Sequence, residues 1–389
     1  MDRINQIKLS HDSFVSLHVQ LRTQVRQLIL SGRWAPGGAV PSENQLSRTL
    51  NISRTTVRLA LQQLELEGLI ARVPGKGTFV ADRGGGDAGT RLLAFVTCGF
   101  DDAEALDLLK GAELEARANG YGIVFSHVRH SRDEASVIKR LQEDGTAGAL
   151  LWPNLDEGQS AQRRVDAFQQ ITMPLVFIDR DIPGVERDLI TSDNIAGARA
   201  LMFHLVELGH RQIVYLSHPM MSIRPVAERY NAYRDVMREA GLTPVEPWLI
   251  GHEGRETVGH QALRASLDSN SLEFQQLKDH VLNAPTRPTA IVAVNDYTAV
   301  LAMRVLKFLN IRVPEGVSIT GFDDIDLAVH LETPLTTVAQ DHSAISRLAT
   351  RVLIDRLQGD TQPARTEVVP VGLRLRSSAT VPVQVTGGA

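Results

Sequence analysis

The sequence is poor in cysteine and in long apolar runs. It holds one cysteine, Cys98, among 389 residues. No internal disulfide can therefore form, and a reducing cytosol is expected. No apolar run reaches the roughly 18–20 residues that a membrane-spanning helix needs. The opening stretch MDRINQIKLSHDSF lacks the apolar region of a secretory signal peptide. These absences favour a cytoplasmic protein.

Signatures of catalysis and of metal binding are also missing. The histidine pairs His127/His130 and His204/His210 lack a zinc-ligand pattern, and no G-x-S-x-G nucleophile elbow occurs. The stretch PGKGT is similar to a phosphate loop, but its glycine spacing is wrong and a strand pattern follows instead of a helix. No lysine has the setting of an aminotransferase Schiff base. We therefore expect no enzyme, no cofactor and no metal.

Charge is distributed unevenly along the chain, although the net charge is only −4. Residues 1–81 hold ten Lys/Arg and five Asp/Glu, whereas the remainder holds 31 basic and 40 acidic residues. A small basic head joined to a larger acidic body indicates that only the head meets a polyanion.

The first 81 residues have the pattern of three helices and a hairpin. Apolar residues at helical spacing over 17–29 predict the first helix. Ser42 and Gln45 fit a capping box that opens the second helix, and Ser53 caps the third. The stretches LIARV and TFVAD are typical of two short strands around a tight turn. Together they predict a winged helix-turn-helix over residues 1–81.

The third helix presents a basic face opposite an apolar one. Its apolar positions, at i, i+3, i+4 and i+7, are Val57, Ala60, Leu61 and Leu64. Arg54, Thr55 and Arg58 project from the other side. A major groove admits one helix, and arginine can bond both acceptors on a guanine edge, which favours DNA recognition. The alternative is a solvated face with incidental arginines. Lys76, between two glycines, suits a DNA phosphate.

This head resembles the DNA-binding domain of the GntR family. The stretches that carry the resemblance are LRTQVRQLILSG and APGGAVPSENQLSRTLNISRTTVRLALQQLELEGLIARVPGKGTFV. The resemblance implies that the third helix enters the major groove and that the hairpin forms the wing. The DNA-binding residues it implies are Glu43, Asn44, Arg54, Thr55, Thr56, Arg58, Gly75, Lys76 and Gly77. Some relatives have an arginine where this chain has Asn44.

A glycine-rich stretch over residues 82–90 predicts a flexible linker before a body at 91–389. In the body, short apolar strands alternate with helices in two successive series. This pattern predicts an α/β fold of two doubly wound parallel units. We expect one lobe from about 91–190 plus 325–340, and a second from about 191–324 plus C-terminal segments. Two such lobes would form a ligand cleft that closes by a hinge.

Polar and aromatic residues follow several of the expected strands. These candidates for effector binding are Phe100, Trp152, Asp179, Arg180, Asn295, Asp296, Asp323 and Gln340. Each one alone could be a cap or turn residue; Asp296, for instance, could cap the helix that starts at Tyr297. Trp152 and Phe100 could pack on a sugar ring or serve as ordinary core. Together the strand ends favour a small polyol or sugar.

The body resembles the effector domain of LacI/GalR regulators, which is similar to periplasmic sugar-binding proteins. The matching stretches include FIDRDIPG, SDNIAGARALMFHLVELGHRQIVYLS, AIVAVNDYTAVLAMRVLKFLNIRVPEGVSITGFDDID and PLTTVAQD. The ligand contacts that this resemblance implies are Asp179, Arg229, Asn295, Asp323 and Gln340. Where the family has a ring-stacking aromatic after WLIGHEG, this chain has Arg255 and Glu256.

A GntR head on a LacI-type body resembles the arabinose-responsive repressors of bacterial sugar operons. The resemblance implies a homodimer that binds a pseudo-palindromic DNA operator and is released by a small sugar such as a pentose. An activator, and a hexose, sugar phosphate or nucleoside as ligand, remain alternatives. We expect ligand closure to reposition the two heads of a dimer, so that they no longer match both half-sites.

Overall fold

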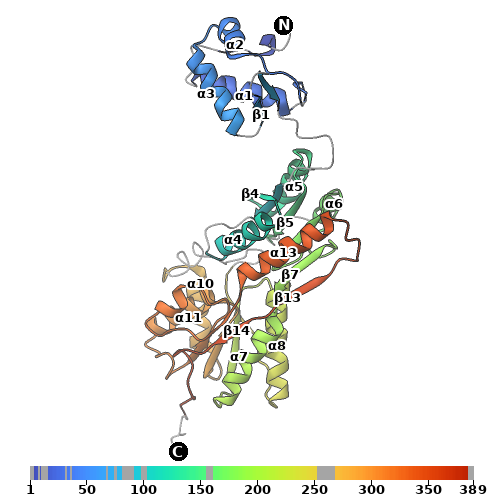
Figure 1. The fold of residues 1–389 in the computed structure, drawn as a ribbon. Coiled ribbons are helices and arrows are strands. Elements are labelled where there is room, and N and C mark those ends of the chain that lie inside the picture. Colours follow the sequence, from blue (N-terminus) through green and yellow to red (C-terminus); the bar gives the residue numbers. More distant parts are fainter. Residues whose placement is uncertain are drawn as a thin grey trace, which may run out of the picture. The chain divides into compact units, whose positions relative to one another are not determined.

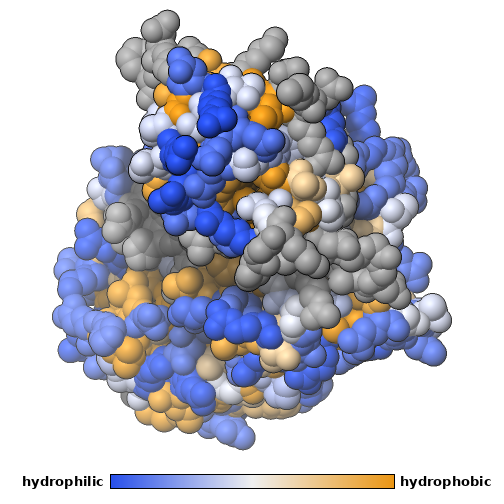
Figure 2. All heavy atoms as spheres, turned by 45° about the horizontal axis from the view of Figure 1, so that its top comes forward, coloured by the Kyte–Doolittle hydropathy of each residue, from blue (hydrophilic) through white to orange (hydrophobic). Residues whose placement is uncertain are grey.

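The computed structural model describes residues 4–7, 9, 16–30, 33–35, 37–66, 69–73, 77–80, 92–97, 103–154, 161–251 and 268–383. The chain divides into two compact units, Met1–Gly89 and Thr90–Ala389, which we call the head and the body (Figure 1). Figure 2 shows hydrophilic side chains over most of the face in view, with smaller apolar areas between them. Within the described part of the chain, no helix is both long and apolar enough to cross a membrane.

The head consists of helices around one apolar core, closed by a hairpin. Its elements are a 3-10 turn (Ile4–Gln6), α1 (Leu17–Leu30), α2 (Glu43–Leu50), α3 (Arg54–Leu66), β1 (Ile70–Val73) and β2 (Gly77–Val80). The two strands are antiparallel, with Ile70 opposite Val80. The capping box of Ser42 and Gln45 is present at the start of α2. The described residues of the head thus form the expected winged helix-turn-helix.

The first lobe of the body, lobe 1, is a six-stranded parallel sheet covered by helices on both faces. Its strands, in sheet order, are β13 (Thr366–Val369), β7 (Asp188–Ser192), β6 (Leu175–Ile178), β5 (Gly148–Trp152), β3 (Leu92–Thr97) and β4 (Gly122–His127). The helices on one face are α4 (Ala103–Ala118) and α13 (His342–Leu357), and those on the other are α5 (Glu134–Glu143), after a 3-10 turn (Ser131–Asp133), and α6 (Ala161–Gln169). Successive residues of each strand point to opposite faces; in β3, Phe95 joins the first core and Val96 the second.

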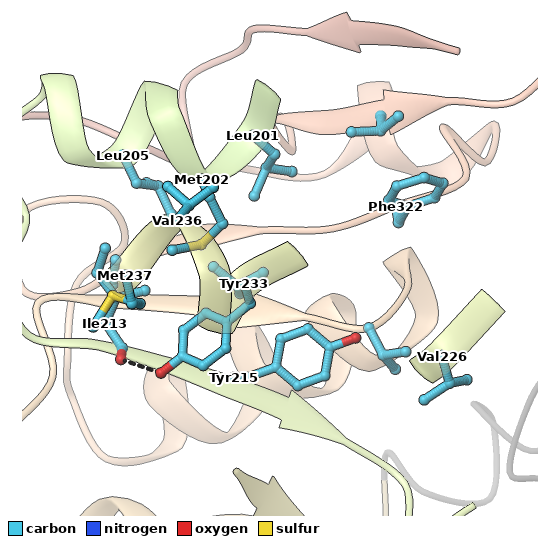
Figure 3. Close-up of a cluster of buried hydrophobic side chains, with 14 of the residues drawn as sticks. Leu201, Met202, Leu205, Ile213, Tyr215, Val226, Tyr233, Val236, Met237 and Phe322 are labelled. Carbon is cyan, nitrogen blue, oxygen red and sulfur yellow. Dashed lines mark hydrogen bonds between the residues drawn. The ribbon is translucent and has the colours of Figure 1, made fainter. Parts of the chain in front are cut away.

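The second lobe, lobe 2, repeats this design with a smaller parallel sheet. Its strands, in sheet order, are β11 (Ser318–Thr320), β10 (Ala290–Ala293), β8 (Ile213–Ser217) and β9 (Trp248–Leu249). One face carries α7 (Asn194–Glu207) and α8 (Arg224–Glu239), and the other carries α10 (Leu272–Asn283), α11 (Asp296–Phe308) and α12 (Leu327–His330). Figure 3 shows the core under α7 and α8, where the Tyr233 hydroxyl donates a hydrogen bond to the Ile213 carbonyl at 3.0 Å.

The described chain passes between the lobes three times: after β7, after β12 (Thr337–Ala339), and between β13 and β14 (Gly372–Arg374). Strands β12 and β14 pair antiparallel beside lobe 2. We call these three crossing segments the hinge, because bending there would change the separation of the two lobes.

The assignment of chain segments to the two lobes differs from our expectation at one place. Residues 325–340 were expected in lobe 1, but they belong to lobe 2, where Ala328 and Leu335 are buried in the core under α11 and Val338 in the core under α7. The segment that returns to lobe 1 is α13 with β13, because Ile345 and Leu353 pack under α4 and β13 pairs with β7. Both segments have apolar strand and helix patterns, so local pattern alone does not decide which sheet each one joins.

Candidate DNA interface and inter-lobe ligand site

The N-terminal half of α3 exposes the residues that were expected to contact DNA. Arg54, Thr55 and Arg58 are exposed, whereas Val57 and Leu61 are buried in the head core. Thr56 is partly buried: its backbone N–H donates to the Ser53 hydroxyl at 3.1 Å, and the two hydroxyl oxygens lie 2.7 Å apart. Thr56 is therefore engaged in the cap of the helix, and the exposed set is the two arginines and Thr55.

Glu43 orients two arginines in this region. Arg58 Nε donates to one carboxylate oxygen of Glu43 at 3.3 Å, and Arg72 Nη2 donates to the other at 3.3 Å. Arg72 also lies 3.2 Å from Glu65. Arg72 was not among the expected DNA-binding residues, although it lies on β1, directly before the wing. Glu43 therefore fixes the positions of the Arg58 and Arg72 side chains.

Among the described residues of the wing, Gly77 has a backbone conformation that other residues rarely adopt. Gly77 has φ +115° and open space where a side chain would begin. Glycine is required at this position because of the backbone conformation and not because of crowding. An exposed backbone at this place can approach a phosphate closely. Asn44 is exposed at the start of α2. Gly75, Lys76 and Phe100 lie outside the described residues.

In lobe 1, three candidate residues meet at the ends of β5 and β6. The Asp179 carboxylate accepts hydrogen bonds from Arg180 Nε at 2.9 Å and from the Trp152 indole N–H at 3.4 Å. The Arg180 guanidinium lies 5.8 Å from the centroid of the Trp152 ring. Asp179 has φ +66°, and the Thr191 hydroxyl donates to its carbonyl at 2.7 Å. A neighbouring strand thus holds this turn in an unusual backbone conformation.

In lobe 2, Arg229 is the central buried charge. Its Nε donates to Asn194 Oδ1 and its Nη1 to the Val294 carbonyl, both at 2.9 Å. The same Nη1 lies 3.6 Å from Asp323, and the guanidinium carbon is 3.7 Å from the centroid of the Phe322 ring. The Arg229 side chain is 8% exposed, and these contacts pair its charge and two of its nitrogens within lobe 2.

Asp323 follows β11 and lies beside Arg229 in lobe 2. Its side chain is 8% exposed and accepts a hydrogen bond from Gln340 Nε2 at 2.7 Å. The pKa of Asp323 is raised to about 6: burial is the main cause, the guanidinium of Arg229 opposes the shift, and the charge of Asp179 adds to it. The two lobes are in contact beside these residues, because Arg224 of lobe 2 donates to Asp181 of lobe 1, two residues after Asp179. We call Trp152, Asp179, Arg180, Arg229, Asp323 and Gln340 the inter-lobe site.

Asn295 and Asp296 have structural tasks at the start of α11. The helix is capped by Asn295, whose Oδ1 accepts from the Thr298 N–H at 2.9 Å, so the alternative in which Asp296 is the cap was wrong. Asp296 is fully buried and accepts hydrogen bonds from the Ile325 N–H and the Thr337 hydroxyl. Burial raises its pKa well above the usual range. Both carboxylate oxygens of Asp296 therefore serve to join strand ends within lobe 2.

Several residues around the site were not predicted from the sequence. Asn194 connects Arg229 to Glu228, since its amide donates to Glu228 at 3.1 Å. His342 begins α13 at the hinge, where burial lowers its pKa while the charges of Asp179 and Asp107 oppose the shift. Asn194 lies in the stretch SDNIAGARALMFHLVELGHRQIVYLS, but no local pattern connects it or His342 with the site. Only their position in the fold does.

A cavity of about 410 Å³ adjoins the site at the hinge. Its lining residues are Asp107, Ala339, Gln340, Asp341, His342, Ser343, Pro370, Gly372 and Arg374. Gln340 belongs both to this cavity and to the inter-lobe site, which places polar side chains around an opening large enough for a small ligand. Among the described residues, no group of three or more His, Cys, Asp or Glu is arranged to hold a metal ion.

Comparison with known proteins identifies both units. Residues 17–80 match the family described as bacterial regulatory proteins of the gntR family. Residues 202–379 match the periplasmic binding protein-like domain. The chain combines a gntR-type head with a periplasmic binding protein-like body. The resemblances of the head and of the body are therefore confirmed, and both point to a regulator and not to an enzyme.

Among the relatives of this chain, the arabinose metabolism transcriptional repressor of Geobacillus stearothermophilus is 25% identical over 348 residues, covering 88% of this chain and 91% of that protein. The ribose operon repressor of Escherichia coli K12 is 27% identical, covering 70% and 77%. A LacI family regulator from Mycobacterium smegmatis has a similar structure, with a TM-score of 0.63 at 22% identity, covering 75% of this chain and all of that chain. At 22% identity, this structural similarity shows a shared fold and not a shared function.

Proposed function

We propose that the protein is a transcriptional repressor of a sugar-utilisation operon, released from its operator by a small sugar such as a pentose. The observation that carries this proposal is a cluster of carboxylate, amide, guanidinium and indole groups in each lobe, beside the Arg224–Asp181 contact between the lobes, in a body joined to a DNA-binding head. The relatives named for arabinose metabolism and for the ribose operon support the choice of a pentose.

The groups at the inter-lobe site suit a hydroxyl-rich ring. Asp179, Asp323 and Gln340 supply acceptors, Arg229 supplies donors, and Trp152 supplies a flat apolar surface. Gln340 Oε1 is buried and has no hydrogen-bond partner among the described residues. A buried acceptor without a donor is costly, so a ligand hydroxyl at this position would gain a strong contact.

The charges at the site favour an uncharged ligand over a phosphate. Arg180 is paired with Asp179 at 2.9 Å, and Arg229 lies 3.6 Å from Asp323. A phosphate would bring negative charge next to these two carboxylates, which would have to be displaced from their arginines. Within the described residues of the site, each positive charge is thus compensated before a ligand arrives.

In the head, we propose that α3 enters the major groove of the operator and that the wing approaches the phosphates. Arg54 and Arg58 would contact base edges, with Glu43 fixing the direction of Arg58. A homodimer would place two such helices on the half-sites of a pseudo-palindrome. Because the chromosome of a bacterium lies in the cytoplasm, the protein acts there.

The test is a thermal-shift series on the full chain with L-arabinose, D-ribose, D-xylose, ribose 5-phosphate and adenosine. A ligand at about 100 times its dissociation constant stabilises a protein by about 2.7 kcal/mol. We expect a pentose to raise the melting temperature of the body and ribose 5-phosphate to leave it unchanged.

Two variants connect the shift with the site. Arg229→Gln should abolish it, whereas Asp326→Asn, a charge change at an exposed residue near Asp323, should retain it. The proposal fails if none of the sugars shifts the protein, or if the shift survives Arg229→Gln undiminished. A shift by the phosphate or the nucleoside alone would replace the pentose by that class of ligand.

A further inference from the structure

An ion pair joins the two lobes at the edge of the inter-lobe site. Arg224, at the start of α8 in lobe 2, donates from Nε and Nη2 to the two carboxylate oxygens of Asp181, at 3.0 and 2.8 Å. Asp181 follows β6 in lobe 1, two residues after Asp179. A bidentate contact of this kind fixes both the distance and the angle between its partners. The pair therefore constrains the separation of the lobes.

Arg224 has a second carboxylate within its own helix. Its Nη1 lies 3.6 Å from Glu228, one helical turn further along α8. When the lobes separate, Arg224 loses Asp181 but keeps Glu228, so opening leaves no unpaired guanidinium. The arginine thus has a partner in both the open and the closed arrangement, which keeps the difference in free energy between them small.

We propose that Asp181 and Arg224 are positioning residues of the inter-lobe site: their ion pair holds lobe 1 and lobe 2 at the separation at which Asp179 and Arg229 reach one ligand. The proposal rests on the function proposed above, because it concerns the same site. Neither residue has to touch the ligand. Their effect is on the population of the closed arrangement, and a ligand that binds this arrangement has an affinity that scales with that population.

The magnitude follows from the partial exposure of the pair. The side chains of Arg224 and Asp181 are 38% and 28% exposed, so water and salt screen the attraction. The bond to Arg224 lowers the pKa of Asp181, so the pair stays charged at neutral pH. We expect loss of the pair to weaken ligand binding about two- to fivefold.

The chain offers a matched control. Arg199 and Glu239 also form a bidentate pair, at 2.9 and 2.8 Å, with side chains 33% and 48% exposed. Both residues belong to lobe 2, on α7 and α8. Glu239→Gln therefore removes a similar ion pair without affecting the contact between the lobes.

The experiment has two readouts on the full chain. The first is the distance between spin labels on the exposed residues Lys139 of lobe 1 and Asp279 of lobe 2, each replaced by cysteine in a Cys98→Ser background, measured without ligand. The second is the affinity for L-arabinose and D-ribose, with the melting temperature of each variant as the check on folding.

We expect Asp181→Asn and Arg224→Gln to lengthen or broaden the distance distribution and to weaken binding two- to fivefold, as estimated above for loss of the pair. The double variant should be no worse than Arg224→Gln, because both changes remove one interaction. Glu239→Gln should change neither readout. The inference is overturned if Asp181→Asn leaves the distance distribution unchanged, or if the two single effects add.

The two proposals fail in different ways. If neither pentose binds the unmodified protein, the proposed function loses its support, but the label distances still decide whether the pair sets the separation of the lobes. If a pentose binds and the distances do not respond to Asp181→Asn, the proposed function stands and the positioning role is wrong.

Discussion

Asp323 is expected to reduce the stability of the protein at neutral pH while serving ligand binding. Its pKa is raised from 3.8 to about 6, chiefly by burial. Since one pKa unit corresponds to about 1.4 kcal/mol, the cost of ionising this carboxyl in the folded protein is on the order of 3 kcal/mol. The folded protein binds this proton more tightly than the unfolded chain does. The stabilising contribution is therefore complete below about pH 4 and is lost as the pH rises through about 6.

Asp323→Asn removes this titration and keeps the shape of the side chain. The asparagine is neutral at every pH, and its oxygen can still accept the hydrogen bond from Gln340. We expect the variant to be about 3 kcal/mol more stable than the unmodified protein at pH 7.5, which raises the melting temperature of a 300-residue body by about 5 °C. It should also lose ligand binding, because an ionised acceptor is gone.

The assay is thermal unfolding of both proteins between pH 3.5 and pH 8. The two melting temperatures should be close below about pH 4, should diverge as the pH rises from about 4 to about 6, and should keep a constant difference above that. Asp326→Asn, the same charge change at an exposed position near Asp323, should follow the unmodified protein. Parallel profiles of the unmodified protein and Asp323→Asn would show that the carboxyl titrates normally and would refute the reasoning.

Three further outcomes follow from the structure. Arg58→Ala should weaken operator binding by about 1–3 kcal/mol and relax the base preference, measured by anisotropy on operator and scrambled DNA; equal affinities would contradict its role. Tyr233→Phe removes the hydrogen bond to the buried Ile213 carbonyl and should cost about 1 kcal/mol in thermal denaturation, without effect on ligand affinity. Gly111→Ala would place a methyl group 2.4 Å from the Ser343 carbonyl oxygen, so α4 and α13 must move apart, with a loss of about 1–3 kcal/mol seen as a lower melting temperature.

Local signals in the sequence were sufficient for most of the head. A capping box and a helical period depend on residues three and four positions apart, which is why Ser42, Gln45 and Ser53 could be assigned from the sequence. The task of Glu43 could not, because its partners Arg58 and Arg72 are 15 and 29 positions away. The same limit applies to Asn295 and Asp296, two adjacent residues of similar capping propensity, which are distinguished by distant partners of Asp296 such as Thr337.

In the body, the sequence by itself determined that parallel strands would alternate with helices and that polar residues would stand at their ends. Only the tertiary structure decided that residues 325–340 join lobe 2 and that Asp181 meets Arg224 across 43 positions. The reason is physical: strand and helix formation depend on neighbours in the chain, whereas the partner of a charge depends on which sheets and helices pack together. An arginine in a sequence shows that a positive charge exists; the fold determines whether it is compensated, and therefore which ligand it can hold.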